Sequence, residues 1–118
     1  MKGSIVAIVT PMLGNGEVDF DSFKKLLSFH EENNTDGIVL VGTTGESATL
    51  SANEREEIFK FAVAETEIPL MAGVGSSSTR EACRLVEIAA KSGITECLAV
   101  TPYYNKPSQT GLELHFNE

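Results

Sequence analysis

The stretch Ile38-Val-Leu-Val-Gly-Thr-Thr-Gly-Glu-Ser-Ala-Thr-Leu-Ser-Ala-Asn-Glu54 contains a complete passage from a strand to a helix. Its first four residues are apolar and mostly β-branched, which is typical of a buried strand. A turn rich in Gly and Thr follows. Ser51 and Glu54 then have the spacing of a capping box, in which a hydroxyl and a carboxylate bond free backbone amides at a helix N-terminus. This stretch predicts one strand–helix unit.

The same unit recurs along the chain. Short apolar runs bounded by Gly, Pro or Thr predict three more buried strands, at Ile5–Val9, Leu70–Ala72 and Cys97–Val100. Segments with apolar residues at helical spacing lie between the strands. A fourth helix is expected to begin near Ser108.

Further residues predict where the helices begin and end. Asp19 and Ser78 are expected as N-caps, and Glu81 would complete a second capping box with Ser78. Asn34 and Gly93 are expected to end helices, because both residue types tolerate the left-handed turn found there. The order is therefore βαβαβαβ followed by the start of a helix, which predicts a parallel sheet with right-handed crossovers.

Two α/β architectures accept this order: a doubly wound open sheet, or a TIM (β/α)₈ barrel, which needs eight units and about 250 residues. The chain has 118 residues and stops at Glu118, inside the predicted fourth helix. That stop favours a fragment. The order of elements itself leaves both architectures open.

Charge and composition exclude several classes of partner. Seventeen acidic against nine basic residues leave a net charge of −8, which argues against binding to nucleic acid or to an anionic membrane. No apolar run approaches the roughly 20 residues of a membrane-spanning helix, and no secretory signal is recognised. The two cysteines, Cys83 and Cys97, form no CxxC pair. A cytoplasmic protein is expected.

The chemistry is expected where the predicted strands end, since ligands of both architectures bind there. In Gly42–Ser47, glycines bring backbone amides close to a ligand and Thr hydroxyls add donors, which suits a small carboxylate or phosphate. A tight turn with Thr as local caps is the structural alternative. The turn is not a P-loop, because no Lys follows Gly45, and Gly73-Val-Gly75 is a defective dinucleotide fingerprint.

Two tyrosines and two histidines are the remaining candidates. Tyr103 and Tyr104 could pack, or a phenol over the pocket could relay protons with a neighbour such as Thr43. His30 lies on an apolar helical face and His115 in the terminal helix, and neither is near a carboxylate cluster. No metal and no cofactor are expected.

Four motifs in register resemble the dihydrodipicolinate synthase (4-hydroxy-tetrahydrodipicolinate synthase) family, within the pyruvate-dependent Schiff-base aldolases. They are Gly3-Ser-Ile-Val-Ala-Ile-Val-Thr-Pro-Met12, Gly42-Thr-Thr-Gly-Glu-Ser-Ala-Thr-Leu50, Met71-Ala-Gly-Val-Gly75 and Val100-Thr-Pro-Tyr-Tyr-Asn-Lys-Pro-Ser-Gln109. Sibling aldolases such as N-acetylneuraminate lyase share the Gly-x-Thr-Gly core, but usually differ after it. Glu46–Leu50 together with Tyr103-Tyr104-Asn105 favours the synthase.

The resemblance implies a TIM barrel, usually a tetramer built from tight dimers. Residues 1–118 would then be the N-terminal half of a single barrel domain. The resemblance also implies condensation of pyruvate with aspartate 4-semialdehyde in lysine biosynthesis, through a Schiff base on a Lys of the sixth strand. Matching motif to motif, Thr43 would be the relay threonine and Thr44 would help bind the pyruvate carboxylate. Tyr104 would be a relay tyrosine that reaches into the partner's active site.

The resemblance further implies an allosteric pocket for lysine, used by feedback-inhibited members. Its positions here are Ala48, Ser77, Glu81 and Tyr103, with Tyr103 at the dimer interface. Ala52 and Arg55 stand where histidines are often found near that pocket, which is a departure from the inhibited members.

The Schiff-base Lys, the tyrosine of the fifth strand and the Arg for the second substrate would all follow residue 118. We therefore expect the isolated chain to be inactive, and unstable unless it pairs with a second copy or a complementary half. The alternatives are a sibling aldolase, or a non-catalytic half barrel that presents Thr43 and Thr44 to small carboxylates.

Overall fold

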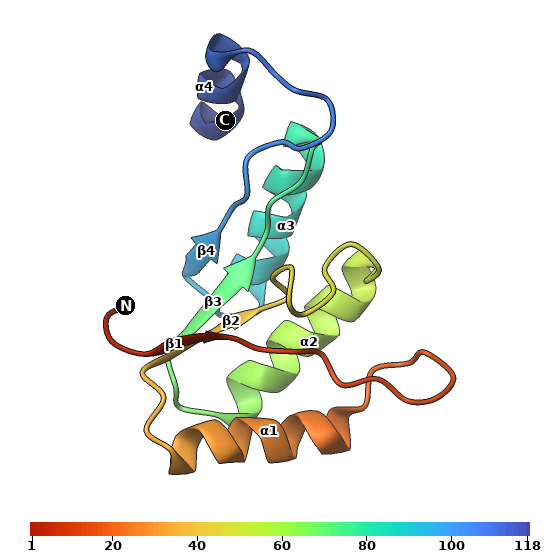
Figure 1. Cartoon of the computed structure of the whole chain (residues 1–118), viewed down its shortest axis with the longest axis vertical. Helices are drawn as coiled ribbons and strands as arrows, with labels where there is room; N and C mark the ends of the chain where they lie inside the picture. Colours follow the sequence, from red (N-terminus) through yellow and green to blue (C-terminus); the bar gives the residue numbers. More distant parts are fainter.

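The computed structural model describes residues 1–118 as four strands that alternate with four helices (Figure 1). The strands are β1 (Ile5–Ala7), β2 (Gly37–Leu40), β3 (Leu70–Gly73) and β4 (Glu96–Leu98). The helices are α1 (Phe20–Glu32), α2 (Ala52–Glu65), α3 (Thr79–Lys91) and α4 (Gln109–Asn117). The alternation predicted from the sequence is confirmed.

The four strands form one parallel sheet in the order β1-β2-β3-β4. Val39 of β2 pairs with Ala7 on one side and with Met71 of β3 on the other, and Met71 in turn pairs with Glu96. A doubly wound sheet reverses its strand order and carries helices on both faces. Sequential order with right-handed crossovers places the helices on one face, as in a barrel.

The hydrophobic core lies between the sheet and helices α1 to α3. Ile38 and Leu40 are fully buried on the helix side of β2, where the core also contains Phe23 of α1 and Phe59 of α2. Leu85 and Ala89 contribute the buried side of α3. These residues alternate along β2 and recur every three or four positions in the helices, as the sequence pattern predicts.

The other side of the sheet is apolar but open to solvent. Ile5 and Val9 at one end of the sheet, and Leu98 and Val100 at the other, keep 41–51% of their surface exposed. In a closed barrel this side faces the interior and is covered by the opposite strands. β1 and β4 are also shorter than the sequence predicts, because each pairs on one side only.

The predicted helix boundaries are largely confirmed. Asp19 accepts a hydrogen bond from the backbone of Ser22, and Asn34 and Gly93 have positive φ angles of 55° and 96°. Ser51 and Glu54 form the complete capping box. The second predicted box is half formed: Ser78 caps the amide of Glu81, but the Glu81 carboxylate pairs instead with Arg84 at 3.7 Å.

Helix α4 stands apart from the other helices (Figure 1). It begins where predicted, with Ser108 as N-cap, and none of its residues is buried. A hydrogen bond of 2.8 Å between Thr79 and the His115 ring connects it to the start of α3. None of the helices is long and apolar enough to cross a membrane.

Candidate functional site

The β2–α2 loop, residues 41–51, lies at the carboxyl end of the sheet and has an unusual backbone. Val41 has a φ of 52° and Glu46 a φ of 58°. A β-branched residue rarely adopts the left-handed region, which costs on the order of 1–3 kcal/mol, so the surrounding structure must hold it there. Such residues cluster at ligand sites. The loop that carries Thr43 and Thr44 is therefore held in one specific shape.

Two glycines allow the backbone to pack this closely. A Cβ at Gly73 of β3 would lie 2.2 Å from the carbonyl oxygen of Val41, which leaves no room for a side chain. A Cβ at Gly45 would lie 3.1 Å from the carbonyl oxygen of Ile8. The strained residue Val41 is thus packed directly against the neighbouring strand.

Two side chains from outside the loop donate hydrogen bonds to its carbonyl oxygens. The buried hydroxyl of Thr10, just after β1, donates to the oxygen of Gly45 at 2.8 Å. Arg55 of α2 donates from Nη2 to the oxygen of Ser47 at 2.5 Å and from Nε to the oxygen of Leu50 at 3.3 Å. Neither role was expected from the sequence, because Thr10 lies 35 residues from Gly45 and Arg55 lies eight residues from Ser47.

Two cavities open beside this loop. A small one of about 60 Å³ lies among the ends of β2, β3 and β4, and Thr43, Gly75 and Val100 line it. A larger one of about 360 Å³ shares these three residues and also Ser47. Its other lining residues are Glu46, Ala48, Arg55 and Tyr103. The first is close to the volume of one or two water molecules, whereas the second can hold a small organic molecule.

The structure brings together most of the site residues expected from the sequence. Thr43, Ala48 and Tyr103 line the larger cavity. Ser77 lies beside it and donates a hydrogen bond of 2.8 Å to the carbonyl oxygen of Tyr103. Thr44 is exposed on the same loop as Thr43, but it lines neither cavity.

Tyr104 is the exception. Its residue surface is 98% exposed, and its φ is 71°. A hydrogen bond between this phenol and Thr43, which the residue pattern suggested, is not formed within the chain.

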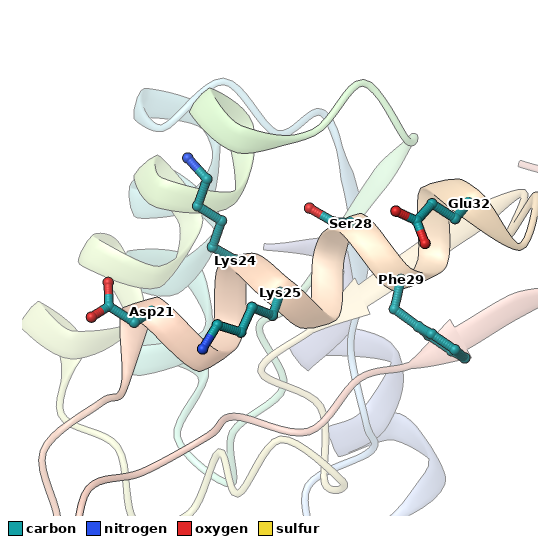
Figure 2. A pocket seen from close by; sticks show the side chains of 6 residues that line it. All are labelled: Asp21, Lys24, Lys25, Ser28, Phe29 and Glu32. Atoms are coloured by element: carbon teal, nitrogen blue, oxygen red, sulfur yellow. The ribbon is translucent and has the colours of Figure 1, made fainter.

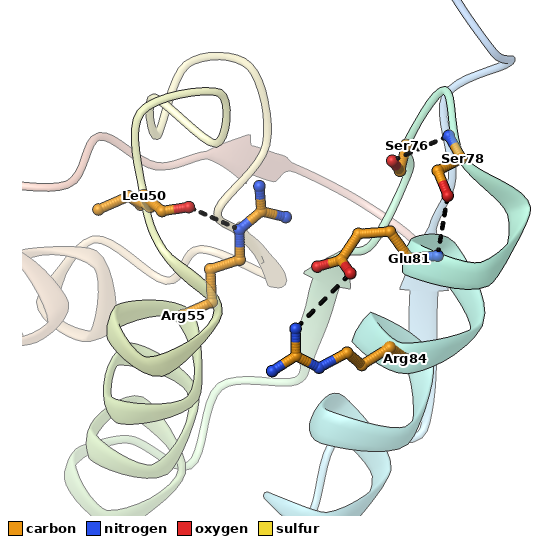
Figure 3. A network of polar contacts seen from close by, with 6 residues as sticks. All are labelled: Leu50, Arg55, Ser76, Ser78, Glu81 and Arg84. Atoms are coloured by element: carbon orange, nitrogen blue, oxygen red, sulfur yellow. Dashed lines mark hydrogen bonds and ion pairs between the residues drawn. The ribbon is translucent and has the colours of Figure 1, made fainter.

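The charge beside the larger cavity comes from Arg55 and Glu81. Partial burial lowers the pKa of the Arg55 guanidinium, and the nearby Glu81 carboxylate acts in the opposite direction. Arg55 does not pair with Glu81, which is bonded to Arg84 (Figure 3). Nη1 of Arg55 is buried without a hydrogen-bond partner.

Other parts of the surface do not form a comparable site. A hollow of about 600 Å³ runs along the outer face of α1, lined by Asp21, Lys24, Lys25, Ser28, Phe29 and Glu32 (Figure 2). All six residues come from one helix, far from the carboxyl ends of the strands. No three His, Cys, Asp or Glu side chains gather in a way that could hold a metal ion.

The sheet, the one-sided helices and the polar loops at the strand ends define a protein of the TIM-barrel class, represented here by four βα units. The family model of the dihydrodipicolinate synthetase family matches residues 1–118. The 4-hydroxy-tetrahydrodipicolinate synthase of Dechloromonas aromatica is 53% identical over 118 residues. That match includes 98% of this chain and 40% of the relative.

Solved structures of the same family are also similar to this chain. A crystal structure of dihydrodipicolinate synthase from Aquifex aeolicus superposes with a TM-score of 0.94 at 46% identity, over 98% of this chain and 40% of that one. The chloride-inhibited enzyme from Acinetobacter baumannii, complexed with pyruvate, gives a TM-score of 0.92 at 52% identity, over 97% and 40%. The chain belongs to the dihydrodipicolinate synthetase family. It spans about 40% of the length of these relatives, and it matches the N-terminal part of the enzyme.

Proposed function

We propose that this chain is the N-terminal half of a 4-hydroxy-tetrahydrodipicolinate synthase, a lyase that condenses pyruvate with aspartate 4-semialdehyde. The observation that supports this most is the strained β2–α2 loop, which presents Thr43 to a cavity at the strand ends. The relative of known structure at 52% identity was solved with pyruvate. The smaller cavity at the ends of β2, β3 and β4, which Thr43 lines, would be the share of the keto-acid site that this half barrel supplies.

Within this proposal, Thr44 and the amides of the loop hold the carboxylate of pyruvate. A lysine amine attacks the keto carbon and water leaves, which gives an imine. Loss of a methyl proton then yields an enamine, whose carbon attacks the carbonyl carbon of the aldehyde. Thr43 and Tyr104 pass protons between the reacting oxygen atoms and solvent.

The lysine that forms the imine is proposed to lie outside residues 1–118. An imine-forming amine is typically held in a buried, desolvated position. All six lysines of this chain are exposed: Lys2, Lys24, Lys25, Lys60, Lys91 and Lys106. The isolated chain is accordingly expected to bind but not to convert the keto acid.

Exposure of Tyr104 also supports a subunit arrangement. A tyrosine that is 98% exposed on a strained backbone can act in catalysis only in a site that the rest of the protein or another subunit completes. We propose a homotetramer of tight dimers in the cytoplasm, with Tyr103 at the dimer interface. Light scattering on the native-length protein should give the mass of four subunits, and a monomeric mass would contradict this arrangement.

The larger cavity is proposed to stand where feedback-inhibited members of the family bind lysine, with Ala48, Ser77, Glu81 and Tyr103 around it, but not to bind lysine tightly in this protein. Arg55 adds a fixed positive charge on its wall. A second cation such as lysine should therefore bind weakly. Titration of the native-length enzyme with lysine is expected to leave its rate unchanged up to millimolar concentrations, and inhibition in the micromolar range would refute this expectation.

The direct test of the function is a condensation assay on the native-length protein. Pyruvate with aspartate 4-semialdehyde should be consumed in equal amounts. Pyruvate with a sugar aldehyde should not react at a comparable rate. The opposite preference would identify a sibling aldolase, and no pyruvate consumption with either aldehyde would remove the enzyme proposal.

A further inference from the structure

The β2–α2 loop needs external support because it combines two strained residues with an exposed ligand-binding edge. Val41 and Glu46 both occupy the left-handed region, and Thr43 and Thr44 between them are exposed. Hydrogen bonds within the loop are ordinary turn contacts, such as the amide of Glu46 to the oxygen of Thr43 at 3.1 Å. These contacts alone do not explain why Val41 remains in a disfavoured conformation.

The support comes from the two side chains on opposite sides of the loop. Thr10 lies after β1, is 6% exposed, and binds the oxygen of Gly45. Arg55 lies in the first turn of α2 and binds the oxygens of Ser47 and Leu50. Of the three bonded carbonyls, that of Gly45 comes directly after Thr44, and those of Ser47 and Leu50 lie further along the same loop.

The guanidinium of Arg55 is suited to this position. Its planar fork donates to two carbonyls at once, which the single ammonium of a lysine cannot do with the same geometry. Figure 3 shows Arg55 reaching back from α2 toward Leu50, while Arg84 of α3 pairs with Glu81. Partial burial makes each of these charge-assisted bonds stronger than it would be in water.

We propose that Thr10 and Arg55 are positioning residues that hold the β2–α2 loop in the shape that binds the keto-acid carboxylate. Neither residue touches the substrate. They act by fixing the carbonyls of Gly45, Ser47 and Leu50, and thereby the directions of the amides and hydroxyls of Thr43 and Thr44. This inference rests on the proposed function for its kinetic part, and on the loop geometry alone for its structural part.

The kinetic test uses the native-length protein with Arg55→Lys and Thr10→Val. Thr10→Val keeps the size of the side chain and removes the hydroxyl. Each variant should raise the KM for pyruvate about tenfold, which corresponds to about 1.4 kcal/mol. The KM for the aldehyde should stay within about twofold of the unchanged protein. Thr10→Ser, which retains the hydroxyl, should restore most of the affinity for pyruvate.

A matched control is Arg80→Lys, since Arg80 is exposed on α3. It should leave both KM values unchanged. A merely structural role for Arg55 would lower the fraction of active enzyme, and hence the apparent kcat, without moving the KM for pyruvate. That result, or a rise of both KM values together, would overturn the proposal.

Amide hydrogen exchange separates this inference from the proposed function. In Arg55→Lys and Thr10→Val, the amides of residues 42–50 should exchange about tenfold faster than in the unchanged protein, while those of β2 should not change. Faster exchange without any condensation activity in the unchanged protein would retain the positioning role and refute the function. Unchanged exchange in an active enzyme would refute the positioning role alone.

Discussion

The β2–α2 loop and the β4–α4 loop (residues 99–108) both follow a strand of the same sheet, but they are held very differently. In the first, Thr10 and Arg55 bind loop carbonyls from the sheet and from α2. In the second, Ser77 donates a hydrogen bond to the backbone oxygen of Tyr103, Asn105 donates one to that of Ser77, and Ser108 accepts one from the amide of Gly111.

Both loops contain non-glycine residues with positive φ. In the β4–α4 loop these are Tyr104 and Lys106, at 71° and 44°. A strained backbone conformation persists only where neighbouring contacts hold it in place. In the first loop these contacts come from this chain, whereas Tyr104 of the second loop is exposed to solvent. The carbonyls of the first loop are thus held by contacts within residues 1–118, whereas the side chain of Tyr104 in the second loop is left almost fully exposed.

The largest expected effect comes from Gly73→Ala in β3. Its new methyl group would overlap the carbonyl oxygen of Val41, so the end of β2 must move. We expect a loss of about 3 kcal/mol in the free energy of unfolding, together with loss of pyruvate binding. Chemical denaturation measures the first and calorimetric titration the second. Gly14→Ala is the control, since nothing lies within 4 Å of a Cβ there, and equal effects of both changes would contradict the close packing.

Thr43→Val is expected to have the next largest effect. It keeps the shape of the side chain but removes the hydroxyl that is proposed to relay protons, so kcat of the native-length protein should fall about 10³-fold. The melting temperature should hardly change, because Thr43 is exposed. Thr43→Ser should recover a large part of the rate. Full activity in Thr43→Val would remove this residue from the chemistry.

Tyr104→Phe tests the second of the two loops, the β4–α4 loop. We expect kcat to fall about 10²-fold in the assembled protein, because the phenol is proposed to relay protons in the partner's site. Mixing this variant with Thr43→Val should restore part of the activity, since some hybrid sites would then contain both hydroxyls. Absence of such recovery in subunit-exchanging mixtures would show that the two residues do not act across subunits.

The smallest effect concerns the capping box after the first loop. The Glu54 carboxylate accepts hydrogen bonds from the amide and hydroxyl of Ser51, and these bonds lower its pKa below the ordinary 4.5. A lowered pKa in the folded state contributes stability above pH 4.5, and that contribution disappears as the pH falls through the lowered value. Glu54→Gln should therefore melt slightly earlier than the unchanged protein at pH 7.

The two melting temperatures should converge as the pH is lowered below 4.5 toward 3. Thermal melts at several pH values across this range measure the difference. A gap that stays constant with pH would show that the charge of Glu54 has no part in the cap.

Much of the fold was predictable because its signals are local. Ser51 and Glu54, three residues apart, have the spacing of a capping box and so predict the start of a helix. Asn34 and Gly93 predict helix ends by residue type alone, because both tolerate the left-handed backbone conformation found there. The strands were predictable from short apolar stretches rich in β-branched residues. The one-sided cover of the sheet followed only from the family resemblance, since the same element order also fits an open sheet.

The residues of the candidate site were predictable, but the backbone strain and the hydrogen bonds that hold its loop were not. Thr43 and Tyr103 were found by motif and do line one cavity. The positive φ of Val41 was not predictable, because β-branched residues disfavour the left-handed region. The close approach of β2 to β3 at this point depends on Gly73, which packs against the carbonyl oxygen of Val41. The hydrogen bond from Thr10 to the oxygen of Gly45 also depends on tertiary structure, since 35 residues separate the two.

The central claim is that residues 1–118 bind the keto acid while an amine outside them forms the imine. The most direct test treats the native-length protein with pyruvate and borohydride, digests it and maps the modified peptide by mass spectrometry. The account predicts a single lysine adduct beyond residue 118 and no modification of the six lysines within this chain. A specific adduct on any of those six, or no adduct anywhere, would contradict it.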